Sequence, residues 1–114
     1  MQPWREALER EVEAAALARR AGDPARAFAH LERAHILSQR HAWLHCRVHA
    51  AMWRWAWWQT DVRELAGQVP RMVAALVFSR IWVPTGNTGG ARVSAFKPMQ
   101  VPADLRALVE EAAS

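Results

Sequence analysis

The five histidines of this 114-residue chain all lie between positions 30 and 49. On helical spacing His35, His45 and His49 fall among apolar neighbours, and so does the carboxylate of Glu32. Polar groups on core-facing positions usually either form a buried hydrogen-bond network or hold a metal ion. Because Cys46 is the only cysteine, a metal site here would be built mainly from nitrogen and oxygen ligands.

Two local motifs contain these candidate ligands. Glu32 and His35 form an E-x-x-H pair, whose members are neighbours on a helix surface, as in carboxylate-bridged metal sites. His45 and His49 form an H-x-x-x-H pair, whose imidazoles lie one turn apart and can chelate one ion. Metalloprotease chemistry is not supported because Cys46 follows His45 where zinc proteases have glutamate. A di-iron site would need a second E-x-x-H pair.

Four other polar residues are weaker candidates. Glu11 falls on the apolar face of the first expected helix and could supply a further oxygen ligand. Gln39 shares the arc of Glu32 and His35 and could hydrogen-bond to one imidazole from behind and so fix its tautomer, without binding the metal itself. His30 points toward the arginine-rich side of its helix, and His41 sits at an expected helix break.

The candidate ligands suit zinc, iron, manganese or nickel and predict a small metal-binding protein for sequestration, sensing or redox. In the alternative, Glu32 bridges His35 to a histidine of the next helix within a hydrogen-bonded core, and the protein is a non-catalytic adaptor. On one straight helix His35 and His45 would lie about 15 Å apart. A shared site therefore requires the chain to reverse near residue 40, or a second subunit. No pair of nucleophile and base can be nominated, so enzymatic activity stays open.

Turn-forming residues predict the helices that position these side chains. Gly22 ends a first helix, and Asp23 with Pro24 begins the next as N-cap and first helical residue. Asp61 begins a later helix, with Glu64 completing an Asp version of the capping box. The expected helices span residues 3–20, 24–59 with a break near 38–41, 61–80 with Pro70 kinking or dividing it, and 102–113.

These elements predict a single all-α domain over residues 1–114. Residues 21–27 resemble residues 59–65 at a spacing of 38, which favours an antiparallel bundle of stacked helical hairpins with a tetratricopeptide-like layout. Residues 83–91 form an expected glycine-rich loop, which lacks the lysine of a phosphate-binding P-loop. A short C-terminal helix completes the expected fold.

Charge and aromatic content suggest possible partners. The net charge is +4, and arginines recur every seven residues from Arg26 to Arg54, which is typical of a solvated helix face. Nucleic acid is not the expected partner. Trp55, Trp57 and Trp58 point around most of their helix, which favours an interface with a protein partner or a second copy of the chain. The sequence has no bilayer-length apolar run and no signal peptide, so we expect a cytoplasmic protein without a membrane segment.

Three segments resemble a known family over nearly the whole chain. They are residues 27–37, which contain HLERAHIL, residues 86–91, which contain NTGGA, and Lys97 to Met99. They are similar to the family of small bacterial proteins called domain of unknown function 3703. The resemblance implies a bacterial protein, and no activity carries over with it. The family pattern includes histidines matching His30 and the three apolar-face histidines, and it has glycine where this chain has Ser38, which fits a helix end there.

Overall fold

The computed structural model describes residues 2–79 and 81–113. Within these residues every regular element is a helix and no strand occurs, which confirms the all-α prediction. The elements are α1 (Pro3–Arg20), α2 (Pro24–Ser38), α3 (Ala42–Gln59), α4 (Val62–Phe78), the short 3₁₀ helix η1 (Ala103–Leu105) and α5 (Arg106–Ala113). None of the helices in the described part of the chain is long and apolar enough to cross a membrane.

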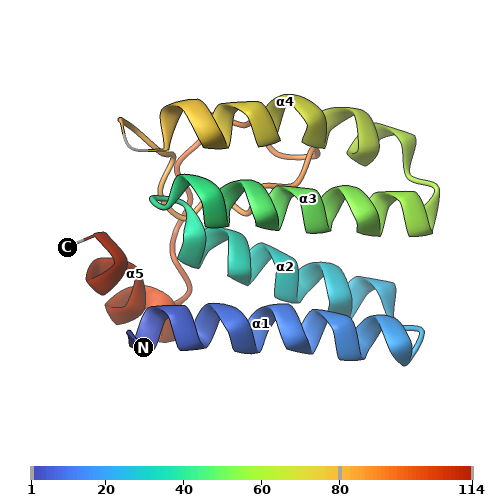
Figure 1. The fold of residues 1–114 in the computed structure, drawn as a ribbon, viewed down its shortest axis with the longest axis horizontal. Helices are drawn as coiled ribbons and strands as arrows, with labels where there is room; N and C mark the ends of the chain where they lie inside the picture. Colours follow the sequence, from blue (N-terminus) through green and yellow to red (C-terminus); the bar gives the residue numbers. More distant parts are fainter. Residues whose placement is uncertain (1, 80, 114) are drawn as a thin grey trace.

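The four long helices form two antiparallel hairpins, α1 with α2 and α3 with α4, and α2 packs against α3 (Figure 1). The first hairpin turns as the sequence predicts. Gly22 has a φ of +73°, Asp23 accepts a hydrogen bond from the Arg26 amide through its side chain, and Pro24 is the first helical residue. The tetratricopeptide-like stacking of the two hairpins stays a prediction.

The chain reverses between α2 and α3, and this reversal positions the histidines. Helix α2 ends at Ser38 and α3 begins at Ala42, so residues 24–59 form two helices, broken where the sequence favoured a break. The amide of His41 donates to the Ser38 carbonyl at 2.9 Å across the turn. The reversal turns the end of α2 back alongside the start of α3, which is the condition that a shared histidine site requires.

Helix α4 differs from the prediction at its start. Asp61 caps it by accepting from the Glu64 amide at 3.1 Å, but the Glu64 carboxylate does not complete a capping box. That carboxylate instead accepts from the amide of Ala91 in the loop after α4. Pro70 lies inside α4, where the sequence predicts either a kink or a division, and the helix is not divided there. The expected end at Arg80 lies outside the described residues.

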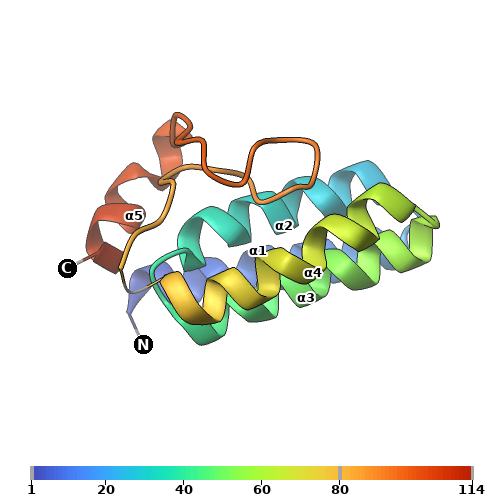
Figure 2. The ribbon, with the colours of Figure 1, turned by 90° about the horizontal axis from the view of Figure 1, so that it is seen from above.

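The segment after α4 carries backbone groups to the histidines. Residues 81–102 contain no helix or strand, and Figure 2 shows the chain crossing above α2 and α4 before it reaches α5. Gly86 and Gly89 take positive φ values of +83° and +85°, which glycine adopts without strain. Helix α5 then lies at the start of α1, where its Glu111 carboxylate accepts from the Trp4 amide at 3.0 Å.

Candidate metal centre

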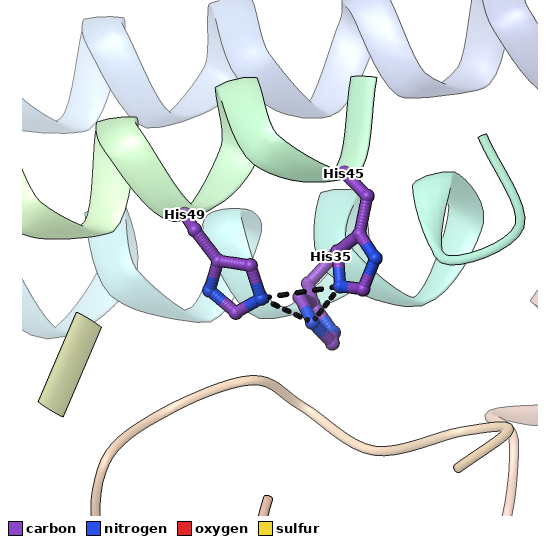
Figure 3. A group of neighbouring side chains, drawn as sticks. All are labelled: His35, His45 and His49. Carbon is purple, nitrogen blue, oxygen red and sulfur yellow. Dashed lines mark hydrogen bonds between the residues drawn. The ribbon is translucent and has the colours of Figure 1, made fainter. Parts of the chain in front are cut away.

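Three buried histidines from two helices direct the same ring atom toward one point (Figure 3). His35 comes from the last turn of α2, and His45 and His49 from successive turns of α3. The Nε2 atom of His35 lies 2.8 Å from that of His45 and 3.1 Å from that of His49, and the last two are 3.1 Å apart. The ligand atoms that this group offers lie close enough together to hold a metal ion.

The opposite ring nitrogen of each histidine has its own hydrogen-bond partner. His35 Nδ1 lies 2.7 Å from the main-chain carbonyl of Asn87. A carbonyl can only accept a hydrogen bond, so His35 carries its proton on Nδ1. His49 Nδ1 lies 2.5 Å from Oε1 of Gln68, and the Gln68 amide nitrogen donates to Glu64 and to the Gly89 carbonyl. These two acceptors fix the orientation of the amide, so its oxygen accepts from His49 Nδ1.

His45 also donates from Nδ1, in its case to a hydroxyl oxygen. Its Nδ1 lies 2.8 Å from Oγ of Ser79, and that hydroxyl donates its only proton to the Ala75 carbonyl one turn earlier in α4. Ser79 Oγ must therefore accept from His45 Nδ1. All three imidazoles thus have the same tautomer, with a proton on Nδ1 and a lone pair on Nε2.

The environment keeps these imidazoles neutral. Burial, with the neighbouring His49 as the next cause, lowers the pKa of His45 to about 3, and burial lowers the pKa of His49 to about 4. Burial also places the pKa of His35 well below its usual range. The Nε2 atoms lie at hydrogen-bond distance from one another, but the tautomers leave no proton to share between them. The arrangement presents three lone pairs to one point, as a cation requires.

A buried carboxylate supports the His49 partner. Glu64 is only 1% exposed, and its carboxylate accepts from the Ala91 amide at 2.9 Å and from the Gln68 side chain at 2.6 Å. Hydrogen bonds therefore connect the Glu64 carboxylate, the Gln68 amide and the His49 imidazole in series. Outer groups of this kind fix the orientation of metal-binding histidines and raise their basicity.

A family model described as "Protein of unknown function (DUF3703)" matches residues 2–109. The chain belongs to this family. The match confirms the resemblance seen in the sequence, and it covers the three histidines together with the residues that hold their Nδ1 atoms. No curated protein and no solved structure matches the chain.

Sequence reasoning missed the groups that hold the imidazoles of this DUF3703 protein. Glu64, Gln68, Ala75 and Ser79 are spaced so that they share one face of α4, and this periodicity was the available signal. Asn87 belongs to the NTGGA segment, which the sequence marks as a turn-forming loop and a family motif but not as part of a site. Its main-chain carbonyl is the part that contacts His35, and a main-chain contact leaves no residue-type signal.

The other predicted ligands lie elsewhere. Glu32 is outside the group of side chains that could share an ion. Burial raises the pKa of its carboxylate, and a hydrogen bond with Thr88 offsets only part of that rise. Glu11 accepts from His30 Nδ1 at 2.7 Å, so these two candidates pair with each other. The side chain of Gln39 donates to the Pro84 carbonyl and accepts from a loop amide, and it holds the loop rather than an imidazole nitrogen.

The three tryptophans of the predicted partner surface differ in their environments. Trp57 is 67% exposed. Trp55 is half-buried against Phe28, and its indole nitrogen donates to a main-chain carbonyl in α2 at 2.9 Å. Trp58 lies under the guanidinium of Arg19. A surface for a protein partner or a second copy stays a prediction, and among these three residues Trp57 is the one that offers substantial exposed area.

Gly89 provides a test of how closely the loop fits the histidines. A Cβ atom at this position would lie 2.5 Å from Cδ2 of His35, and its φ of +85° already disfavours any other residue. We expect Gly89→Ala to destabilise the protein by about 1–3 kcal/mol from backbone strain alone. The added Cβ should also displace His35 and so lower zinc affinity. Chemical denaturation and zinc titration measure the two effects.

Gly22→Ala is the matched control, because Gly22 also has a positive φ but nothing lies within 4 Å of its added Cβ. This variant should show the backbone penalty and unchanged zinc affinity. Equal zinc affinity in both variants would contradict the close packing of Gly89 on His35.

Proposed function

We propose that this DUF3703 protein binds one transition-metal ion through the Nε2 atoms of His35, His45 and His49. The supporting observation is the shared tautomer, in which three neutral imidazoles direct lone pairs at one point and hold their protons on the opposite nitrogen. Nitrogens bound about 2.0–2.1 Å from one tetrahedral zinc ion lie about 3.3–3.4 Å apart. The Nε2 separations of 2.8 Å and 3.1 Å are shorter by roughly half an ångström or less, so the rings need to spread only slightly to share one ion.

The donor set narrows the metals that we expect. Imidazole nitrogens suit zinc, iron and nickel, whereas manganese prefers carboxylate oxygens, and Glu32 lies outside the cluster. Zinc is the first choice. Structural zinc sites usually have four protein ligands, while sites with three leave a position for water or another molecule. Three histidines therefore support exchange, sensing or chemistry at the ion better than a purely structural role.

Elemental analysis of protein purified without a histidine tag tests the proposal. After growth with zinc, iron, nickel, manganese and copper we expect about one ion per chain, with zinc or another nitrogen-preferring metal dominant. His30→Ala serves as the control, because His30 is on the same helix as His35 but pairs with Glu11. Wild-type protein that stays far below one ion per chain after zinc dialysis would refute the site.

Removing the partner of His49 should weaken metal binding without removing a ligand. We expect Gln68→Leu to lower zinc affinity by about 10–100-fold, because His49 loses the acceptor that fixes its tautomer and orientation. Gln100→Leu makes the same substitution at an exposed position and should leave the affinity unchanged. Competition against a zinc-binding dye measures both, and equal affinities would mean that Gln68 does not act on the site.

A further inference from the structure

A cavity of about 550 Å³ adjoins the three histidines on the side of α4 and the loop. This volume lies in the range of small-molecule sites. The three imidazoles line part of the cavity, and most of the remaining wall is apolar. The apolar lining includes Pro70, Ala74, Phe78, Trp82, Val83 and Phe96. An ion held by the histidines would therefore face an apolar chamber whose outer wall is open to solvent, since Pro70, Ala74 and Phe96 are exposed.

The polar side chains of the cavity wall are already engaged, with one exception. Asn87 donates to two loop carbonyls and accepts from the Gly89 amide. Arg71 uses its terminal nitrogens to hold the carbonyls of Gly67 and Val93, but its Nε atom is buried and has no hydrogen-bond partner among the described residues. Two of the five N–H groups of the Arg71 guanidinium are used in this way, so this cation on the cavity wall keeps unused donors, the Nε–H among them.

Charge identifies the class of molecule that fits. Arg71 is positive, none of the described residues that line the cavity is acidic, and a bound divalent ion would add two further positive charges. An anionic group is the complement. The surrounding wall is apolar, so a single charge on an apolar body is desolvated at lower cost than a doubly charged group such as phosphate.

We infer that the cavity binds an alkyl monocarboxylate. The carboxylate occupies the open position of the metal on the side of Arg71, and the alkyl chain lies along the apolar wall toward Phe78 and Trp82. Both of these aromatic side chains are more than half exposed, so the chamber is open to solvent there. This inference rests on the metal site proposed above, because the histidines alone supply no charge to hold the carboxylate.

The test uses cobalt(II) as a visible substitute for zinc, titrated with acetate, butyrate, hexanoate and octanoate. Cobalt binding itself reports on the three histidines. Each carboxylate should change the cobalt absorption, and affinity should rise about fourfold per added methylene until the cavity is filled. Pentan-1-ol, which has the same five-carbon alkyl group without the charge, should bind more weakly than hexanoate.

A cavity-filling variant separates the chamber from the metal. Ala74→Phe places a ring in the cavity and should reduce octanoate affinity to nearly that of acetate while cobalt binding persists. Ala66→Phe makes the same change at an exposed position of α4 outside the cavity and should behave as wild type. Cobalt binding with no dependence on chain length would overturn the monocarboxylate inference alone. Absence of cobalt binding would overturn both the inference and the proposed function.

Discussion

Replacing His49 by alanine is expected to lower zinc affinity by at least about a hundredfold. Loss of an outer partner alone typically costs 10–100-fold, and this change removes a ligand itself. Only the two imidazoles of His35 and His45 then remain, with Nε2 atoms 2.8 Å apart. We expect the same scale of loss for alanine at either of those positions, measured by competition against a zinc-binding dye at neutral pH.

The control for this prediction is already present on α2. His30→Ala removes an imidazole five residues before His35, but His30 pairs with Glu11 and lies outside the cluster. Its zinc affinity should match wild type. A loss in His30→Ala as large as that in His49→Ala would place the ion elsewhere on the chain, whereas full affinity in all three single ligand variants would refute the histidine site.

Acidification of the metal-free protein is expected to unfold it between about pH 6.5 and pH 4. An unfolded histidine has a pKa near 6.5. Burial lowers the folded pKa of His45 to about 3 and of His49 to about 4, and lowers that of His35 well below 6.5. Below pH 6.5 the histidines bind protons in the unfolded chain but not in the folded chain. The stability that their neutral forms provide is therefore fully present above pH 6.5 and is lost as the pH falls.

The expected change of the free energy of unfolding with pH is large relative to the stability of a small domain. Each such histidine contributes about 1.4 kcal/mol per pH unit, so three contribute roughly 4 kcal/mol per unit near pH 5. Typical domains have only about 5–15 kcal/mol in total. Denaturant titrations at several pH values measure this slope, and His30→Gln should retain it. A free energy of unfolding that stays constant from pH 7 to pH 4 would contradict three buried neutral imidazoles.

Several structural features follow from local sequence. Asp23 with Pro24 and Asp61 mark helix starts because a side-chain acceptor or a missing amide hydrogen suits only that position of a helix. The shared face of His45 and His49 follows from helical periodicity alone. The reversal near residue 40 was favoured because an unbroken helix from Pro24 to Gln59 would be unusually long for so small a protein.

The parts of the site that the sequence did not predict depend on contacts between segments that are distant along the chain. A helical wheel places Glu32 and His35 on one side of α2 but says nothing of how that side meets α3, and only His35 joins the cluster. The partners of the Nδ1 atoms come from α4 and the loop, which lie 19 residues or more away along the chain. The predicted alternative of a buried polar network describes these Nδ1 contacts, but it leaves the three Nε2 lone pairs without donors.

Long-range ¹H–¹⁵N correlation NMR of the histidine rings tests the central claim most directly, because it reports the tautomer and the metal bond of each ring nitrogen. In zinc-loaded protein we expect His35, His45 and His49 to carry protons on Nδ1 and to show metal-bound Nε2 atoms. His30 and His41 should give the same ring signals with and without zinc. A proton on Nε2 of any of the three, or ring signals of the cluster that zinc leaves unchanged, would contradict the account.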